Sequence, residues 1–144
     1  MATASQMITE KGGDVASLGL EATVLEAARL MNERHIGSVL VLDRGRVAGI
    51  FTERDVMRRV VAAKQDPAST RMRDVMTTPV AVASAHTTLD ELRRVMRERR
   101  IRHIPVVGDD DGVVGMISIG DLNRVQHDVD VQTIRYLEQY MSVT

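Results

Sequence analysis

A seven-residue pattern occurs twice in this chain and constrains its fold more than any other feature. The segment Gly49–Asp55 (GIFTERD) returns as Gly115–Asp121 (GMISIGD), 66 positions later (115 − 49), with glycine, hydroxyl and carboxylate at the same spacing. We name these segments the first motif and the second motif. Each lies where a short apolar segment gives way to an expected helix. Helix N-termini attract anions, and carboxylates accept hydrogen bonds from vicinal hydroxyls. The duplication therefore predicts contacts to a phosphate and a sugar.

Both motifs are preceded by the signature of a capped helix. Thr23 and Thr88 each stand three residues before a glutamate, which is the capping-box pattern. Apolar residues follow at helical spacing, and they include Met31 and Met96. We assign these methionines to a packed helix face rather than to a ligand pocket.

Short apolar and β-branched segments surround each helix and predict strands. In chain order, the expected strands are 14–18, 36–42, 47–51, 79–82, 101–107 and 113–117. A second helix is expected to begin at Glu53 or Asp55 in one copy and at Asp121 or Leu122 in the other. The chain thus reads as two β-α-β-β-α repeats, which predicts an α/β (α+β) fold.

These elements divide the chain into repeat 1 (1–66), repeat 2 (71–130) and a C-terminal helix (131–144). The polar segment Asp66–Thr70 has the composition of a linker. An apolar stripe along the C-terminal helix is not required by the repeat, and we expect it to pack on a neighbour. The stripe consists of Val131, Ile134, Leu137 and Met141.

Composition excludes several classes of protein. A chain of 144 residues suits one compact module whose halves share a core. The net charge of −1 and the 2% aromatic content argue against nucleic-acid binding. No segment has membrane-spanning length or the pattern of a secretory signal, so we expect a cytoplasmic protein without membrane association. The absence of cysteine excludes disulfides and thiolate metal sites.

Several residues have simpler explanations than ligand binding. Thr52 with Asp55, and Ser118 with Asp121, also satisfy the pattern of helix caps. His103 with Ser118 and Asp121 has the composition of a hydrolase triad, but no nucleophile elbow is present and we expect no catalysis. The four histidines lack paired metal-ligand spacing. The basic segment 93–100 is interpreted as the solvated face of a helix.

The duplicated motif resembles the signature of the cystathionine-β-synthase (CBS) domain family, whose tandem pairs are called Bateman modules. The resemblance covers residues 7–127 and also rests on the segments 74–80 and 102–107. The second motif and the C-terminal helix look like those of small bacterial stand-alone members. The resemblance implies two pseudo-symmetric repeats packed through their sheets, with a cleft on either side.

The resemblance also implies adenine nucleotides as ligands and transfers roles to residues of this chain. It assigns Asp55 and Asp121 to the ribose hydroxyls, and Thr52 and Ser118 to phosphate. The expected basic partners of phosphate are Arg54, Arg102, His103 and Lys11. The expected adenine walls are Val15, Val39, Val80, Ile104 and Pro105. Flanking positions expected in the clefts are Gly37, Ser38, Thr77, Pro79 and Gly120.

The two clefts are not expected to be equivalent. Gly120 takes the position of Arg54, and Gly37-Ser38 stand where the second copy has Arg102-His103. One site is therefore expected to differ from the other in ligand, or to stay empty.

The resulting prediction is a regulatory sensor module that binds AMP, ADP, ATP or NAD and has no catalytic cofactor. It acts on a separate effector protein or through self-association, and a homodimer is expected. The alternative is a structural or scaffold dimer with degenerate clefts, in which the motifs only cap helices.

Overall fold

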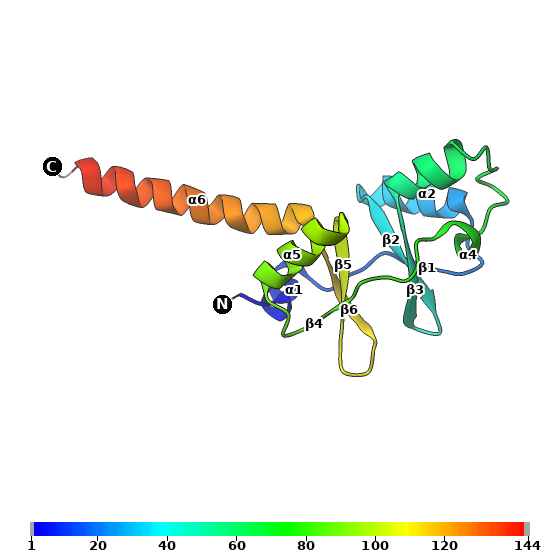
Figure 1. The fold of residues 1–144 in the computed structure, drawn as a ribbon, viewed down its shortest axis with the longest axis horizontal. Helices are drawn as coiled ribbons and strands as arrows, with labels where there is room; N and C mark the ends of the chain where they lie inside the picture. The colour runs from blue at the N-terminus through cyan, green and yellow to red at the C-terminus, as the bar shows by residue number, and fades with distance from the viewer. Residues whose placement is uncertain (1, 143–144) are drawn as a thin grey trace.

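The chain folds into two similar lobes, each built on a three-stranded sheet (Figure 1). The computed structural model describes residues 2–142, except for the side chains of 127–129, 136 and 138–142. The first lobe contains β1 (Ser17–Gly19), α2 (Val24–Arg34), β2 (Ser38–Asp43), β3 (Arg46–Thr52), α3 (Glu53–Asp55) and the π-helix η1 (Val56–Val61). The second contains β4 (Ala83–Ser84), α5 (Leu89–Arg99), β5 (His103–Val107), β6 (Val113–Ser118) and α6 (Ile119–Ser142). The tandem α/β repeat is thus confirmed.

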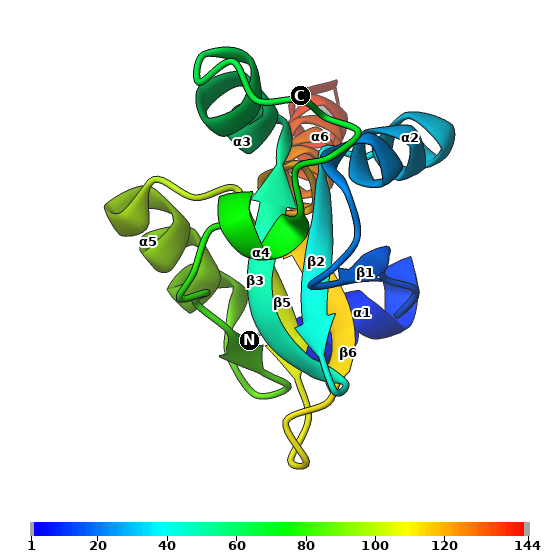
Figure 2. The same ribbon diagram turned by 90° about the vertical axis from the view of Figure 1, so that its right-hand side faces the viewer.

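The two sheets have the same topology. In the order β1-β2-β3, the first pair is parallel and the second antiparallel, and β4-β5-β6 repeats both relationships. Even the irregularity is duplicated, because the register shifts between Val41 and Leu42 and again between Val106 and Val107. Figure 2 shows the sheet of the first lobe in front of that of the second.

The capping boxes at Thr23 and Thr88 are both formed, as the sequence predicts. Each helix then ends at a residue in the left-handed region, His35 (φ 54°) or Arg100 (φ 55°). β2 and β5 begin two residues later than predicted. Two of the residues skipped, Gly37 and Arg102, instead accept hydrogen bonds through their carbonyl oxygens from the first N–H groups of α3 and α6.

Two other strand predictions were wrong in their boundaries. Residues 14–16 and 79–82 are not in strands, and the short strands β1 and β4 begin at Ser17 and Ala83. Pro79 has no N–H to donate to a ladder and follows a cis peptide bond. Val15 and Val80 pack between the sheets, so residues 14–16 and 79–82 are held by side chains rather than by strand pairing.

We call the segments before the first strand of each repeat, 3–16 and 71–82, the lead-ins. The helix of each lead-in packs on the opposite lobe. Helix α1 (Ala4–Lys11) lies beside β4 and β6 and places Ala4 and Met7 in the core of the second lobe (Figure 1). Helix α4 (Met72–Val75) places Met72 and Val75 in the core of the first lobe. A third cluster, centred on Leu40, Ile50 and Met116, joins the two sheets. The repeats are therefore interlocked, and neither lobe has a complete core without the other's lead-in.

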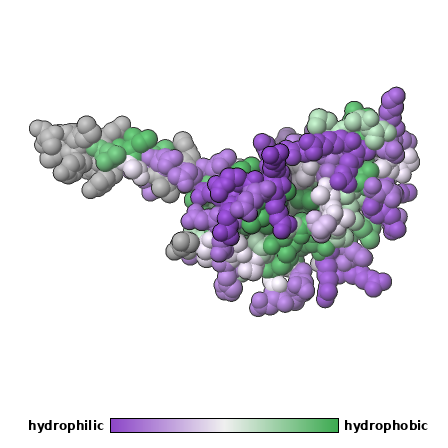
Figure 3. All heavy atoms as spheres, in the orientation of Figure 1, coloured by the Kyte–Doolittle hydropathy of each residue, from purple (hydrophilic) through white to green (hydrophobic). Residues whose placement is uncertain are grey.

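Helix α6 continues without a break from the second motif through the expected C-terminal helix and projects away from both lobes (Figure 1). Ile134 and Leu137 on this helix are 55% and 50% exposed. The side chain of Met141, the last member of the predicted stripe, lies outside the described residues. Hydrophobic residues are visible on the projecting helix in Figure 3. Within residues 2–142, none of the helices combines the length and apolarity needed to cross a bilayer.

Candidate functional site

Both motifs form the helix caps that their residue types predict. Thr52 N–H donates to Asp55 Oδ2 at 2.9 Å, and Asp55 N–H donates to Thr52 Oγ1 at 3.4 Å. Ser118 and Asp121 repeat this arrangement at 2.8 and 3.1 Å. The hydroxyl and carboxylate thus hold the start of α3 and of α6, and each carboxylate is fixed at the end of a strand.

The glycine of each motif permits close packing of the opposite lead-in. A Cβ on Gly49 would lie 2.5 Å from Met76 Sδ, and a Cβ on Gly115 would collide with Ile8 of α1. Met76 directly follows α4. The two glycines are therefore explained by the approach of a neighbouring segment, which capping alone does not require.

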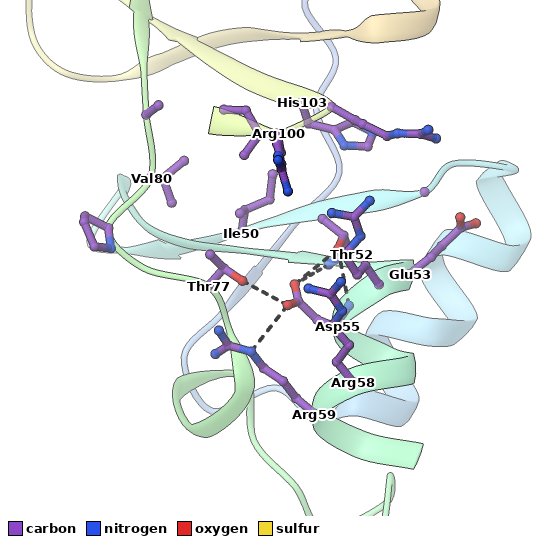
Figure 4. Close-up of a pocket in the computed structure, with 16 residues that line it drawn as sticks. Ile50, Thr52, Glu53, Asp55, Arg58, Arg59, Thr77, Val80, Arg100 and His103 are labelled. Atoms are coloured by element: carbon purple, nitrogen blue, oxygen red, sulfur yellow. Dashed lines mark hydrogen bonds and ion pairs between the residues drawn. The ribbon is translucent and has the colours of Figure 1, made fainter. Parts of the chain in front are cut away.

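Asp55 is the polar centre of the first motif. It is 7% exposed, and Thr77 Oγ1 donates to its Oδ1 at 2.9 Å. Arg59 Nε lies 3.5 Å from the same oxygen, and Arg59 also donates to the carbonyl oxygen of Met76. Figure 4 shows Thr77 and Arg59 pointing toward Asp55. The Thr52 hydroxyl also contacts Oδ2 of Asp55, at 3.3 Å. The carboxylate thus faces two neutral hydroxyls and one guanidinium that is half exposed.

A cavity of about 470 Å³ opens beside Asp55. Its lining comes from both lobes: Gly37, Ile50, Thr52, Glu53, Arg54, Asp55, Arg58, Arg59, Thr77, Pro79, Val80, Ala81, Arg100, Ile101, Arg102 and His103. Five arginines and two acidic residues give the lining a formal charge of +3 (5 − 2). Arg100 and His103 approach from the opposite side to the first motif (Figure 4). The cavity therefore combines a positive rim, one fixed carboxylate and an apolar wall.

His103 lies where the cavity meets the second motif. Its backbone pairs with Ser118 across β5 and β6, while its side chain lines the cavity. Burial lowers the pKa of His103 below its ordinary value of 6.5, and the charge of Lys11 lowers it further. Asp121 and Glu53 act in the opposite direction, and Arg102 adds to the lowering. His103 is consequently neutral at neutral pH.

The second motif has a different set of partners. Lys11 Nζ lies 2.5 Å from Asp121 Oδ2 and donates to the carbonyl oxygen of Met116 at 2.6 Å. Arg124 pairs with the other oxygen, Oδ1. Burial alone would raise the pKa of Asp121, but the hydrogen bonds from Lys11 and Ser118 and the charge of Lys11 lower it below 3.8. Asp121 is thus an ionised carboxylate already bound to two cations.

Half of the predicted ligand-binding residues line the cavity: Gly37, Thr52, Arg54, Asp55, Thr77, Pro79, Val80, Arg102 and His103. Lys11, Ser118, Gly120 and Asp121 lie together at the second motif instead. Val39 and Ile104 were predicted as adenine walls, but they are 0% and 1% exposed in the two lobe cores and leave no surface for a ligand.

The remaining predicted wall and flanking residues also lie outside the cavity lining. Ser38 is 8% exposed and pairs with Thr52, and Pro105 pairs with Met116. Val15 packs in the cluster between the sheets.

Sequence reasoning missed three arginines of the cavity. Arg58 and Arg59 follow Asp55 by three and four residues, a spacing that returns to the same side of a helix. That spacing was the available signal. Arg100 carried no such signal, because its position depends on the left-handed end of α5 and on contact with the other lobe.

His103, Ser118 and Asp121, which have the composition of a hydrolase triad, do not form the hydrogen bonds of one. The two oxygens of Asp121 bind Lys11 and Arg124 rather than orienting His103, and Ser118 Oγ accepts the N–H of Asp121. Among the side chains that the structure describes, no three His, Asp or Glu residues gather in a way that would hold a metal ion.

Comparison with known proteins identifies the family. Residues 5–62 and 72–128 each match the model of the CBS domain. The chain therefore belongs to the CBS-domain family and carries two tandem copies. Proteins built on such pairs are generally regulatory modules.

Relatives agree with this assignment. The CBS domain-containing protein YhcV of Bacillus subtilis is 32% identical over 75% of this chain and 76% of its own length. CBSX3, a mitochondrial CBS domain-containing protein of Arabidopsis thaliana, is 36% identical over 71% of this chain. The matched segment spans only 52% of that protein.

Solved structures share the fold. A CBS-domain containing protein of Agrobacterium tumefaciens, ATU1752, has a TM-score of 0.80 at 32% identity, covering 87% of this chain and 99% of its own. Hypoxic Response Protein I, solved with two coordinated zinc ions, has a TM-score of 0.73 at 27% identity, covering 86% of this chain and 98% of its own.

Proposed function

We propose that this chain is a regulatory module that binds an adenine nucleotide in the cavity beside Asp55. The observation that carries the proposal is the composition of that cavity. An apolar wall, a fixed carboxylate and five arginines line one space of about 470 Å³. This volume falls within the range of about 300–1,000 Å³ that small-molecule sites occupy.

Each part of a nucleotide has a matching surface. Ile50, Val80 and Ile101 offer an apolar wall to the base. Asp55 can accept hydrogen bonds from ribose hydroxyls, since a carboxylate provides several acceptor positions. The arginines present planar donor groups suited to phosphate. The charge of +3 favours a phosphorylated ligand over a neutral nucleoside.

The position of the cavity suggests how binding is transmitted. Thr52 and Asp55 come from the first lobe, and Arg100 and His103 come from the second. A ligand that contacts both stabilises whichever arrangement of the lobes fits it better, and it can shift the module's state only by this difference in affinity. The output then passes to a separate effector or to self-association.

One relative supports a regulatory role, and another supports self-association. A signal-transduction role has been suggested for a CBS-domain protein of Burkholderia ambifaria MC40-6, which is 35% identical and has a TM-score of 0.81 over 86% of this chain and 93% of its own. A CBS-CP12 protein from bloom-forming cyanobacteria is hexameric, at 28% identity and a TM-score of 0.74 over 85% of this chain and 71% of its own. For this chain we propose a homodimer, with Ile134 and Leu137 of α6 available for contact.

The direct test is isothermal titration of ligand-free protein with AMP, ADP, ATP and NAD, with GMP and adenosine as controls. We expect an adenine nucleotide to bind more tightly than either control, and Asp55→Asn to weaken it. A thermal shift gives a second readout, because a ligand that binds only the folded state raises its stability. Absence of binding by every compound at millimolar concentration would favour the scaffold alternative, in which both motifs serve only as caps.

A further inference from the structure

We propose that the ammonium group of Lys11 binds Asp121 in place of a ligand at the second motif. Each chain then binds one nucleotide, and binds it at the first motif. The inference rests on the proposed function and adds which motif is used and which residue decides it. It starts from the contact between Lys11 and Asp121, two residues 110 positions apart (121 − 11).

The first step concerns how Lys11 is held. Helix α1 begins in a capping box formed by Thr3 and Gln6, and Ala4 and Met7 are buried in the second lobe. The N–H groups of Ala4 and Ser5 donate to carbonyl oxygens of the loop before α5. Lys11 is the last residue of this helix. Its backbone is therefore anchored, and only its side chain spans the distance to Asp121.

The second step concerns what Asp121 has left to offer a ligand. Oδ2 accepts from both Lys11 and the Ser118 N–H, and Oδ1 accepts from Arg124. Asp121 is 5% exposed and Asp55 is 7% exposed, so the two carboxylates differ in their partners rather than in their burial. A ribose hydroxyl that approached this carboxylate would have to displace a charged partner and so break an ion pair of a nearly buried group, which is costly.

The third step is the contrast with the first motif. There the lead-in helix α4 has four residues against eight in α1, and the neighbouring lead-in group is the hydroxyl of Thr77. A hydroxyl can rotate, and it can accept as well as donate a hydrogen bond. An ammonium only donates. The cation at the first motif, Arg59, lies 3.5 Å from Asp55 Oδ1, whereas Lys11 and Arg124 both lie closer to Asp121. The first motif therefore retains room for a sugar to share Asp55, while the second is filled.

Lys11 also has an advantage over any free ligand. Because it belongs to the same chain, its effective concentration at Asp121 stays fixed when the ligand is diluted. It further places a positive charge near His103, which favours the neutral form of that side chain. Removing Lys11 is expected to free Oδ2 of Asp121, while the residues that line the first cavity stay in place.

The test is isothermal titration with ADP as the probe, comparing the wild type, Lys11→Met, Asp55→Asn and the double variant. Lys11→Met keeps most of the side chain's length and removes its charge. Lys64→Met is the matched control, because Lys64 is the other lysine of the chain and is exposed. Circular dichroism and a thermal melt verify folding.

We expect one ADP per wild-type chain and per Lys64→Met chain, and two per Lys11→Met chain. Asp55→Asn is expected to weaken binding about tenfold or more, since it removes a hydrogen bond to a charged group. The double variant should recover one site at the second motif.

Two ADP sites per wild-type chain would overturn the inference while leaving the proposed function intact. This stoichiometry is measured on the wild type alone. One site in a folded Lys11→Met variant would overturn it as well. No ADP binding by the wild type, with binding of no other adenine nucleotide, would overturn the proposed function and this inference with it.

Discussion

The two motifs have the same backbone role and different electrostatic surroundings. Each caps a helix, and each places a glycine under the opposite lead-in segment. Asp55 meets two threonine hydroxyls and the guanidinium of Arg59 beside a cavity, whereas Asp121 meets a lysine and an arginine. The two motifs show that a duplicated motif can keep its structural function in both copies, and we propose that only one copy remains available to a ligand.

The largest expected effect is on nucleotide affinity. Asp55→Ala should lower affinity about tenfold to a hundredfold, because hydrogen bonds to a charged group contribute about 1.5–3 kcal/mol. Asp121→Ala should change affinity far less, since Lys11 and Arg124 already occupy that carboxylate. Titration calorimetry on the two variants measures the contrast. Equal losses would show that both motifs bind ligand.

For the free energy of unfolding, Asp121→Ala is expected to have the larger effect of the two substitutions. Asp121→Ala removes a helix cap and a nearly buried ion-pair partner, and it should reduce the free energy of unfolding by about 2–3 kcal/mol. This is below the cost for a fully buried pair, because the Lys11 side chain is 31% exposed and water can reach it. Asp55→Ala should cost about 1–2 kcal/mol, mainly through the lost cap. Urea denaturation of both variants gives the values.

A larger loss in Asp55→Ala than in Asp121→Ala would contradict the assignment of the stronger ion pair to the second motif. The ligand-free protein must be used, because bound nucleotide would add its own stabilisation.

The motif glycines sharpen the comparison further. Gly49→Ala and Gly115→Ala each place a methyl group against a packed side chain, at a cost of about 1–2 kcal/mol. Gly115→Ala should cost more, because it meets Ile8 of the anchored helix α1, while Gly49→Ala meets the flexible Met76. The midpoints of urea unfolding provide the measurement. A smaller loss in Gly115→Ala would mean that α1 is held less firmly than the geometry indicates.

The smallest effect expected is the pH dependence of stability near neutrality. The pKa of His103 is lower in the folded than in the unfolded state, so the unfolded state binds more protons as the pH falls. The stabilisation is complete above pH 6.5 and is lost as the pH falls from there through the folded pKa. His103→Gln should remove this dependence, which melting temperatures between pH 8 and pH 5 would reveal. An unchanged profile in the variant would exclude His103 as the source.

Asp121 acts in a separate window. Its lowered pKa stabilises the folded state above pH 3.8, and that contribution is lost as the pH falls below this value. The two groups can therefore be distinguished by the range in which each titrates.

The sequence predicted the local features of this fold well. The capping boxes at Thr23 and Thr88 and the four long strands follow from residue types within a few positions of one another. The first motif, which the sequence singled out, lies beside the cavity. Such features depend on hydrogen bonds and side-chain periodicity within a segment, and a sequence displays both directly.

The features that were missed depend on contacts between distant segments. The packing of α1 on the second lobe brings Lys11 to Asp121. No local sequence pattern predicts this contact. The assignment of Val39 and Ile104 to a ligand wall assumed that one face of each strand was free. Both side chains point instead into lobe cores that helices cover.

The most direct test of the central claim is a crystal structure of the protein with ADP bound. We predict one nucleotide in the cavity, with its ribose hydroxyls on Asp55 and its phosphates among the arginines, while Lys11 remains paired with Asp121. A nucleotide bound at Asp121, or a cavity that stays empty at saturating ADP, would contradict the account.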